Sequence, residues 1–224
     1  MAGKLSVVAT PIGNFGDLTF RALWNLKECN VVYAEDTRVT LKLLNHYGLR
    51  KPIFRLDAAV EAKKADEVVA RLKAGEHVVY VSDAGTPGIS DPGARLVSRV
   101  REELPGATIE TVPGASALTA ALSIAGIRAD QFLFLGFLPH KKGRQTSLKR
   151  IAISEMPVVL YESPHRIMKL LQELERVISK RTIIVARELT KMHEEVLLGT
   201  ASELARQIKT AHKDRGEFVV IVDP

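Results

Sequence analysis

The chain has 224 residues, 46% of them hydrophobic and 26% charged, and its formal net charge is +6. This composition is that of a globular protein with one large domain or two small ones, and the charge mildly favours an anionic partner. The single cysteine, Cys29, excludes an internal disulfide, and no apolar run approaches the roughly 18 residues that span a bilayer, so we expect a cytoplasmic protein without a membrane partner.

Short apolar runs rich in Val, Ile and aromatic residues recur along the chain and predict strands. In chain order they are Leu5–Ala9, Val31–Ala34, Val78–Val81, Thr108–Val112, Phe132–Phe137, Val158–Tyr161, Ile183–Ala186, Val196–Leu198 and Phe218–Val222. Apolar residues at helical spacing lie between most of these runs, and Ser163-Pro164 is expected to begin one helix as N-cap and first helical residue. Strands that alternate with helices predict an α/β fold.

The composition changes near the middle of the chain. Small residues open a predicted helix at Pro113–Ala117, and Gly126 ends it. Four predicted strands precede this helix and five follow it. We therefore expect two α/β domains, residues 1–115 and 116–224, with a cleft between them.

One loop carries more chemical information than any other segment. Ser82–Gly93 reads SDAGTPGISDPG and follows a predicted strand. Glycine permits positive φ and close approach of a ligand, and proline stiffens the backbone. The loop lies where ligands bind in α/β sheets, at the carboxyl end of a strand. We expect Asp91 to be the N-cap of the next helix. We expect Asp83 to contact a ligand, with capping of local N–H groups as its alternative role.

Two further strand-to-helix turns resemble this loop in position. Thr10–Asn14 follows the first predicted strand, and Val112–Ala117 follows the fourth. Each turn by itself has ordinary turn chemistry. Together with Ser82–Gly93, they predict three turns that converge on one crevice.

Several familiar kinds of site are excluded. Gly88 and Gly93 have the spacing of a phosphate-binding loop, but Ala94-Arg95 stands where that loop has Lys and Ser or Thr. The sequence contains no G-x-G-x-x-G motif. Its scattered histidines and single cysteine do not support a zinc site, and we expect no metal.

These motifs resemble those of the ribosomal RNA small-subunit methyltransferase I family, within the tetrapyrrole-methylase superfamily. The resemblance spans nearly the whole chain, in the order TPIGN at Thr10–Asn14, AEDTR at Ala34–Arg38, SDAGTPGISDPG at Ser82–Gly93, VPGASA at Val112–Ala117, YESPHR at Tyr161–Arg166 and ARELTK at Ala186–Lys191. It implies two α/β domains with S-adenosylmethionine in the cleft between them. It also implies a homodimer and 2′-O-methylation of a cytidine ribose in 16S rRNA of the 30S subunit.

The same resemblance implies a set of residues that bind the methyl donor. In the first half they are Pro11, Ile12, Asp83 and Ile89, followed by Ser116 and Ala117 at the start of the middle helix. In the second half they are Tyr161 and Ala186.

A base assists methyl transfer because a ribose hydroxyl is a weak nucleophile. The sequence leaves several candidates open: Glu35, Asp36, Glu162, His165, Glu188, Lys191 and His193. Each also has a structural role available, such as capping by Asp36 or an ion pair of Glu188 with Lys191. We expect Glu162, Arg187 and Glu188 on the acceptor side, because they follow strands of the second half.

A basic cluster follows Pro139-His140. We expect Lys141, Lys142 and Arg144 of this cluster to contact RNA phosphates, and a solvated surface is the alternative. Two other functions stay open. One is methylation of a small tetrapyrrole precursor, and the other is binding of S-adenosylmethionine without catalysis.

Overall fold

The computed structural model describes residues 2–224, and the chain divides into two compact units, residues 1–116 and 117–224. Each unit is built on its own five-stranded sheet with its own hydrophobic core. The α/β class expected from alternating strands and helices is therefore confirmed.

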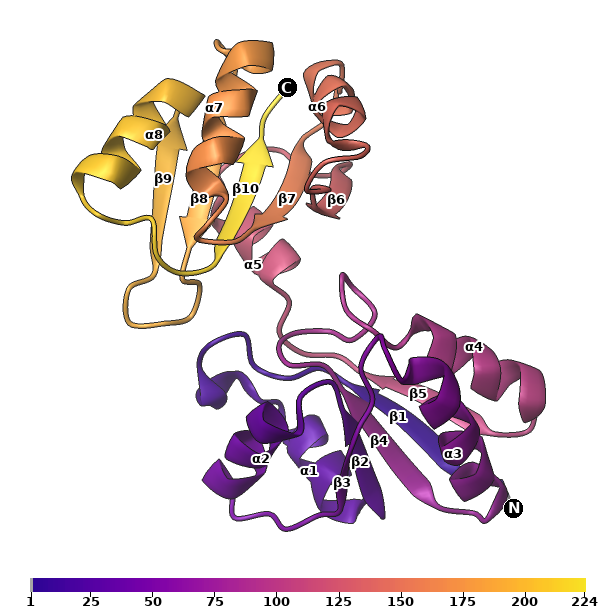
Figure 1. The fold of residues 1–224 in the computed structure, drawn as a ribbon. Helices are drawn as coiled ribbons and strands as arrows, with labels where there is room; N and C mark the ends of the chain where they lie inside the picture. Colours follow the sequence, from indigo (N-terminus) through magenta and orange to yellow (C-terminus); the bar gives the residue numbers. More distant parts are fainter. Residues whose placement is uncertain (1) are drawn as a thin grey trace. The chain divides into compact units, whose positions relative to one another are not determined.

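The sheet of the first unit is parallel throughout, with the strand order β3-β2-β4-β1-β5 (Figure 1). Its strands are β1 (Lys4–Val8), β2 (Val31–Ala34), β3 (Ile53–Arg55), β4 (His77–Val81) and β5 (Thr108–Val112). The sequence analysis missed β3. This strand has three residues at the edge of the sheet and no buried residue, so it lacks the apolar run that predicts a strand.

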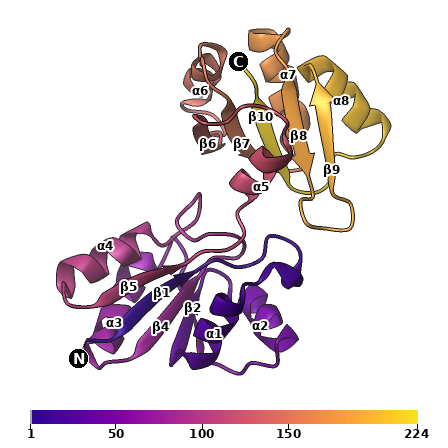
Figure 2. The same ribbon diagram turned by 180° about the vertical axis from the view of Figure 1, so that it is seen from behind.

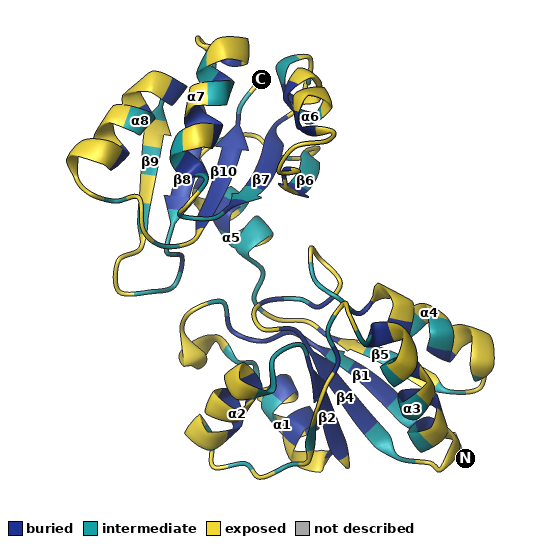
Figure 3. Cartoon of the chain, viewed as in Figure 1, coloured by how far each residue is buried: buried dark blue, intermediate teal, exposed yellow. Residues whose placement is uncertain are grey.

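Helices cover both faces of this sheet. They are α1 (Phe20–Glu28), α2 (Thr37–His46), α3 (Glu61–Lys73) and α4 (Ala94–Glu103), while the short η1 (Phe15–Asp17) before α1 buries no residue. On one face, Leu26 of α1 and Leu44 of α2 pack with strand residues such as Val79. On the other face, Leu72 of α3 and Leu96 of α4 pack with Tyr80. Figure 3 shows β2 and β4 buried between these two layers.

The strand order creates a switch point between β1 and β4. These strands are neighbours, yet the helix after β1 lies on one face of the sheet and the helix after β4 lies on the other. The chain therefore diverges at the carboxyl ends of these two strands. In open α/β sheets this is the place where ligands bind.

The helix starts in the first unit agree with the sequence analysis at one position and differ at another. Asp36 caps α2, because its side chain accepts the N–H of Arg38, as expected. Asp91 does not cap α4. Gly93 occupies the cap position, and one carboxylate oxygen of Glu61 accepts the N–H groups of residues 93, 95 and 96. The N-cap prediction for Asp91 is therefore wrong.

The second unit has a mixed sheet with the strand order β6-β7-β10-β8-β9. Its strands are β6 (Leu133–Phe137), β7 (Val158–Glu162), β8 (Ile183–Arg187), β9 (Glu195–Gly199) and β10 (Phe218–Val222). Only β6 and β7 are parallel, and the other pairs are antiparallel. All five strands were predicted from their apolar runs.

Three helices cover one face of this sheet: α6 (Arg144–Ala152), α7 (Ile167–Ile178) and α8 (Ala201–Thr210). The short α5 (Ala117–Ile124) contacts β10 (Figure 2). The α7 helix begins later than predicted. The carbonyl of Ser163 accepts N–H groups from Arg166 and Ile167, so a turn precedes the regular helix. Within residues 2–224, no helix is long and apolar enough to cross a membrane.

Candidate methyl-donor and acceptor site

Three loops of the first unit meet at the switch point. Thr10, after β1, and Gly85, after β4, exchange two backbone hydrogen bonds with N···O distances of 2.9 and 3.0 Å. The Thr86 hydroxyl donates to the carbonyl of Ala115, after β5, at 3.3 Å. The turns that the sequence analysis expected to converge are thus joined by hydrogen bonds.

Gly85 is needed at this junction because of its backbone conformation. Its φ is +77°, in the left-handed region that side chains rarely adopt. A Cβ at this position would lie 3.4 Å from Cγ2 of Ile12 and 3.6 Å from the carbonyl oxygen of Ala115, which are ordinary van der Waals contacts. The backbone conformation, and not a lack of space, therefore favours glycine here.

Carboxylates gather beside these loops. The Asp36 N–H donates to Asp83 Oδ1 at 2.8 Å, and the Asp83 N–H donates to Glu35 Oε2 at 3.4 Å. Partial desolvation, together with the negative charges of its neighbours, raises the pKa of the Glu35 carboxyl. Partial desolvation of the carboxyl group also raises the pKa of Asp83, although much of that residue is exposed. Asp36 itself is paired with Arg38, whose hydrogen bonds lower the pKa of the Asp36 carboxyl. This part of the first unit favours a cationic ligand.

The first-unit residues expected to bind the donor occupy these loops. Pro11 is buried and Ile12 is half-buried next to Gly85, while Asp83 and Ile89 are exposed. In the second unit, the Tyr161 hydroxyl accepts the N–H of Leu118, near the start of α5. Ala186 is buried in β8, whereas Ser116 and Ala117 are half-buried at the end of one unit and the start of the next.

Glu162, at the end of β7, has one oxygen without a partner. Its side chain is fully buried, and Oε1 accepts the Ser163 N–H and pairs with Nε of Arg166 at 3.2 Å. Oε2 is buried with no hydrogen-bond partner among the described residues. Arg166 also donates to the carbonyl of Leu138, so it ties Glu162 to the segment after β6. The sequence analysis did not single out Arg166, although an acid and a base four residues apart are a recognisable pair.

Arg187 and Glu188 already have several partners. Arg187 pairs with Glu195 at 3.1 Å and donates to a backbone carbonyl. Glu188 pairs with Lys191 at 2.8 Å, as one alternative in the sequence analysis allowed, and it accepts the Glu217 N–H. These contacts give both side chains a clear structural role.

The residues of the predicted basic cluster differ in their exposure to solvent. Lys141 and Lys142 are exposed, but only 3% of Arg144 is accessible. Its guanidinium binds the half-buried Glu173 through two N–H groups and donates to the Pro139 carbonyl. Arg144 was predicted to contact RNA. The structure contradicts this prediction, because the N–H groups of Arg144 donate to acceptors inside the unit. These hydrogen bonds connect α6 to α7.

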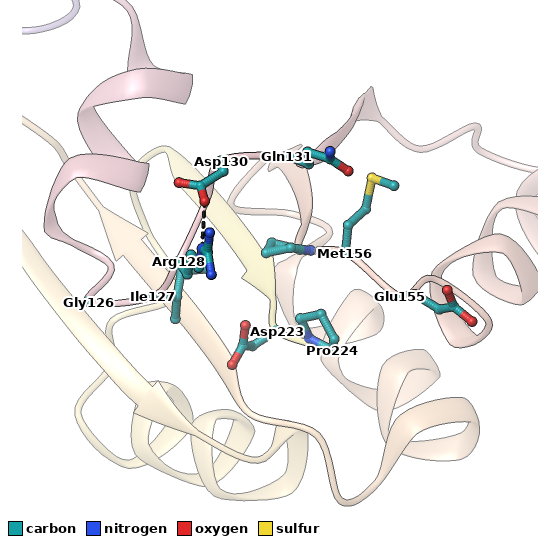
Figure 4. A pocket seen from close by; sticks show the side chains of 10 residues that line it. Gly126, Ile127, Arg128, Asp130, Gln131, Glu155, Met156, Asp223 and Pro224 are labelled. Atoms are coloured by element: carbon teal, nitrogen blue, oxygen red, sulfur yellow. Dashed lines mark hydrogen bonds and ion pairs between the residues drawn. The ribbon is translucent and has the colours of Figure 1, made fainter.

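A pocket of about 590 Å³ lies elsewhere in the second unit (Figure 4). It is formed by the segment before β6, the residues just before β7 and the residues just after β10, and Arg128 and Asp130 form an ion pair on its wall. Because Glu162 lies at the other end of β7, this pocket is remote from it. None of the predicted site residues within 2–224 lines the pocket.

Comparison with known proteins first identifies the broad class of protein to which the chain belongs. The family model of tetrapyrrole (corrin/porphyrin) methylases matches residues 4–205. Among solved structures, the methyltransferase CobJ superposes with a TM-score of 0.73 at 20% identity, over 99% of this chain and 94% of that one. A uroporphyrin-III C-methyltransferase from Thermus thermophilus, solved with S-adenyl homocysteine, gives a TM-score of 0.66 at 18% identity, over 98% of this chain and 97% of that one. The fold is that of a tetrapyrrole methylase.

The more similar relatives carry a narrower name. A protein of Thermotoga maritima named ribosomal RNA small subunit methyltransferase I is 41% identical over 98% of both chains. Proteins with the same name from Xylella fastidiosa and Neisseria meningitidis serogroup B are 45% and 42% identical. They match 98% and 100% of this chain and 81% and 77% of their own lengths. This chain therefore belongs to the ribosomal RNA small-subunit methyltransferase I family of tetrapyrrole methylases.

Proposed function

We propose that this protein transfers a methyl group from S-adenosylmethionine to the 2′-oxygen of a cytidine ribose in 16S rRNA of the 30S subunit. The observation that carries the proposal is the 41% identity with the Thermotoga maritima protein over 98% of both chains. The name of that relative supports ribosomal RNA as the acceptor. The choice of a cytidine 2′-oxygen as the acceptor atom rests on the family resemblance of the motifs described in the sequence analysis.

The first unit fits the donor chemically. S-adenosylmethionine supplies a methyl group on a positively charged sulfonium and also carries an ammonium group. Asp83 and Glu35 provide negative charge beside the converging loops, and Gly85 leaves the backbone open to close approach. We assign donor binding to Pro11, Ile12, Asp83, Ile89 and Ser116, with Ala117, Tyr161 and Ala186 as the candidates in the second unit.

Among the three candidate catalytic residues on the acceptor side, we propose Glu162 as the first choice, ahead of Arg187 and Glu188. A buried carboxylate oxygen without a partner is costly, and a donor from the substrate would satisfy it. Arg187 and Glu188 hold their neighbours in place and would act mainly by positioning. Lys141 and Lys142 remain the proposed phosphate contacts. We also propose a cytoplasmic homodimer, for which light scattering at micromolar concentration is the test.

A tetrapyrrole acceptor is the second candidate, because the solved neighbours include uroporphyrin-III methyltransferases. Their identity to this chain is below 20%, so they support the fold and leave the substrate open. The deciding experiment offers the protein labelled S-adenosylmethionine with either 30S subunits from cells lacking this enzyme or uroporphyrinogen III. Label in the RNA supports the proposal. Label only in the tetrapyrrole overturns it.

The donor site has its own test. Asp83→Ala should weaken S-adenosylmethionine binding in a calorimetric titration, and Asp66→Ala, which removes an exposed carboxylate of α3, is the matched control. Unchanged affinity of the Asp83 variant would remove this residue from the donor site.

A further inference from the structure

Helix α1 of the first unit exposes two aromatic side chains on its outer side. The side that packs on the sheet is formed by Ala22, Asn25 and Leu26. On the opposite side, Phe20 is 93% exposed and Trp24 is 61% exposed. These two residues lie four positions apart, so their rings are neighbours on one face of the helix. Large apolar side chains that gather in solvent mark a site of interaction, whereas single ones are ordinary.

The start of α1 is attached to the loops of the proposed donor site. Thr19 is the N-cap of α1. A Cβ on Gly114, in the converging turn after β5, would lie 3.7 Å from Cγ2 of Thr19, so the turn and the helix start are in contact. The Arg21 guanidinium donates to the carbonyl of Thr111 on β5 at 2.6 Å. Phe20, between Thr19 and Arg21, is therefore held beside one of the three converging turns.

Positive charge accompanies the exposed rings. The ammonium nitrogen of Lys27, one helical turn beyond Trp24, lies 5.9 Å from the centre of the Trp24 ring. Glu28 is the only acidic residue of α1 and lies at its last position. Cations complement the phosphates of RNA, and unpaired bases stack on exposed aromatic rings. Aromatic rings combined with neighbouring cations are typical of a surface that binds single-stranded RNA.

A second copy of the chain fits these rings less well than RNA does. In a two-fold symmetric dimer through α1, the helix would meet the same patch of its partner, so Arg21 and Lys27 would approach their own copies. Two rings also cover only a small part of the roughly 800 Å² per partner that a stable interface buries. An RNA strand needs one ring for each stacked base, and its phosphates attract both cations.

We propose that Phe20 and Trp24 form a stacking surface for unpaired bases of the ribosomal RNA close to the nucleotide that receives the methyl group. The inference rests on the proposed function. The target ribose must reach the donor loops, and the start of α1 is attached to one of these loops. Stacking holds the strand without reading its sequence, because every base has a π-face. The surface therefore binds and positions the RNA and takes no part in the chemical step.

Trp24 is the only tryptophan of the chain, so the fluorescence of the protein reports directly on this surface. A single-stranded oligocytidylate should quench that fluorescence, because a base stacked on an indole ring quenches its emission. Phe20→Ala should weaken binding in this titration by about fivefold or more, which corresponds to the lower range of base–aromatic stacking. Leu198→Ala truncates a side chain of β9 that is 62% exposed, and this matched control should leave the titration unchanged.

Methyl transfer to 30S subunits gives the second readout. Trp24→Ala should raise KM for the subunits by about fivefold or more. The rate at saturating subunits and the affinity for S-adenosylmethionine should stay at the wild-type level, because the ring only positions the RNA. Trp24→Phe should keep most of the affinity, since it retains an aromatic ring. Both rings are exposed, so the urea midpoint of each variant should match that of the wild type.

Unchanged KM in both Phe20→Ala and Trp24→Ala, or wild-type fluorescence that oligocytidylate does not quench, would overturn the inference while the proposed function stands. A dimeric wild-type protein that becomes monomeric in Trp24→Ala would assign the surface to a second copy and would likewise overturn the inference. A wild-type protein that methylates no RNA would overturn both.

Discussion

Thr10 and Gly85 exchange two backbone hydrogen bonds at the ends of β1 and β4, the neighbouring strands whose following helices lie on opposite faces of the sheet. This bridge joins the loop after β1 to the loop after β4. Together with the hydrogen bond from Thr86 to the Ala115 carbonyl, this bridge holds the backbone of the proposed donor loops in place. The site is therefore sensitive to substitutions at glycine.

Gly85→Ala should weaken S-adenosylmethionine binding at least tenfold. Its φ of +77° costs a side chain about 1–2 kcal/mol, and a backbone shift that relieves this strain would disturb the two hydrogen bonds with Thr10. Gly88→Ala is the matched control, because its φ is +83° and no atom lies within 4 Å of its Cβ position. Both variants should lose similar stability, whereas only the first should lose affinity in calorimetry. Equal loss of affinity would assign the effect to backbone strain alone.

Arg144→Ala should destabilise the second unit by about 3–5 kcal/mol, because it leaves the half-buried Glu173 without its charged partner. The midpoint of urea unfolding, followed by circular dichroism, measures this change. The double variant Arg144→Met with Glu173→Leu should recover most of the loss. A fully stable single variant would show that the ion pair does not fasten α6 to α7.

Lys141→Ala and Lys142→Ala should weaken binding to 30S subunits and make it less dependent on salt. Each lost phosphate contact should reduce the slope of log affinity against log salt by about 0.7–0.9. Donor affinity should not change, since these lysines lie outside the donor loops. Lys209→Ala, an exposed lysine on α8, serves as control. Binding that is unchanged in both variants would mean that the two lysines are only a solvated surface.

Asp91→Asn should stabilise the folded protein more at pH 7 than at pH 4.5. The pKa of Asp91 in the folded state is about 6, above its ordinary value of 3.8, so ionisation at pH 7 disfavours the folded state. This penalty fades as the pH falls through 6 towards 4, because the folded protein then binds the proton. Urea midpoints at the two pH values measure the difference, with the exposed Asp214→Asn as control. A loss of stability at pH 7 would contradict the environment assigned to Asp91.

The strands and the converging turns were readable from the sequence because each has a strong local pattern. Nine apolar runs became strands, and glycine and proline marked the turns at Thr10, Ser82 and Val112. The short edge strand at Ile53 had no such run. The start of α7 was predicted too early, because Ser163-Pro164 begins a turn and the regular helix follows it.

The roles of single polar residues were harder to predict, because they depend on partners distant in the sequence. Asp91 stands where an N-cap is expected, but Glu61 reaches the same N–H groups from α3. Arg144 lies in a basic run of the sequence, yet it is buried and forms an ion pair with Glu173 on α7. Local spacing contains no information about either partner.

The most direct test of the central claim is mass spectrometry of nucleosides from 16S rRNA. The RNA comes from 30S subunits of cells lacking this enzyme, treated with the purified protein and S-adenosylmethionine carrying a deuterated methyl group. We predict one deuterated 2′-O-methylcytidine per 16S molecule, and none when the donor is omitted. A deuterated methyl group on a base, or RNA without the label while uroporphyrinogen III accepts it, would contradict the account.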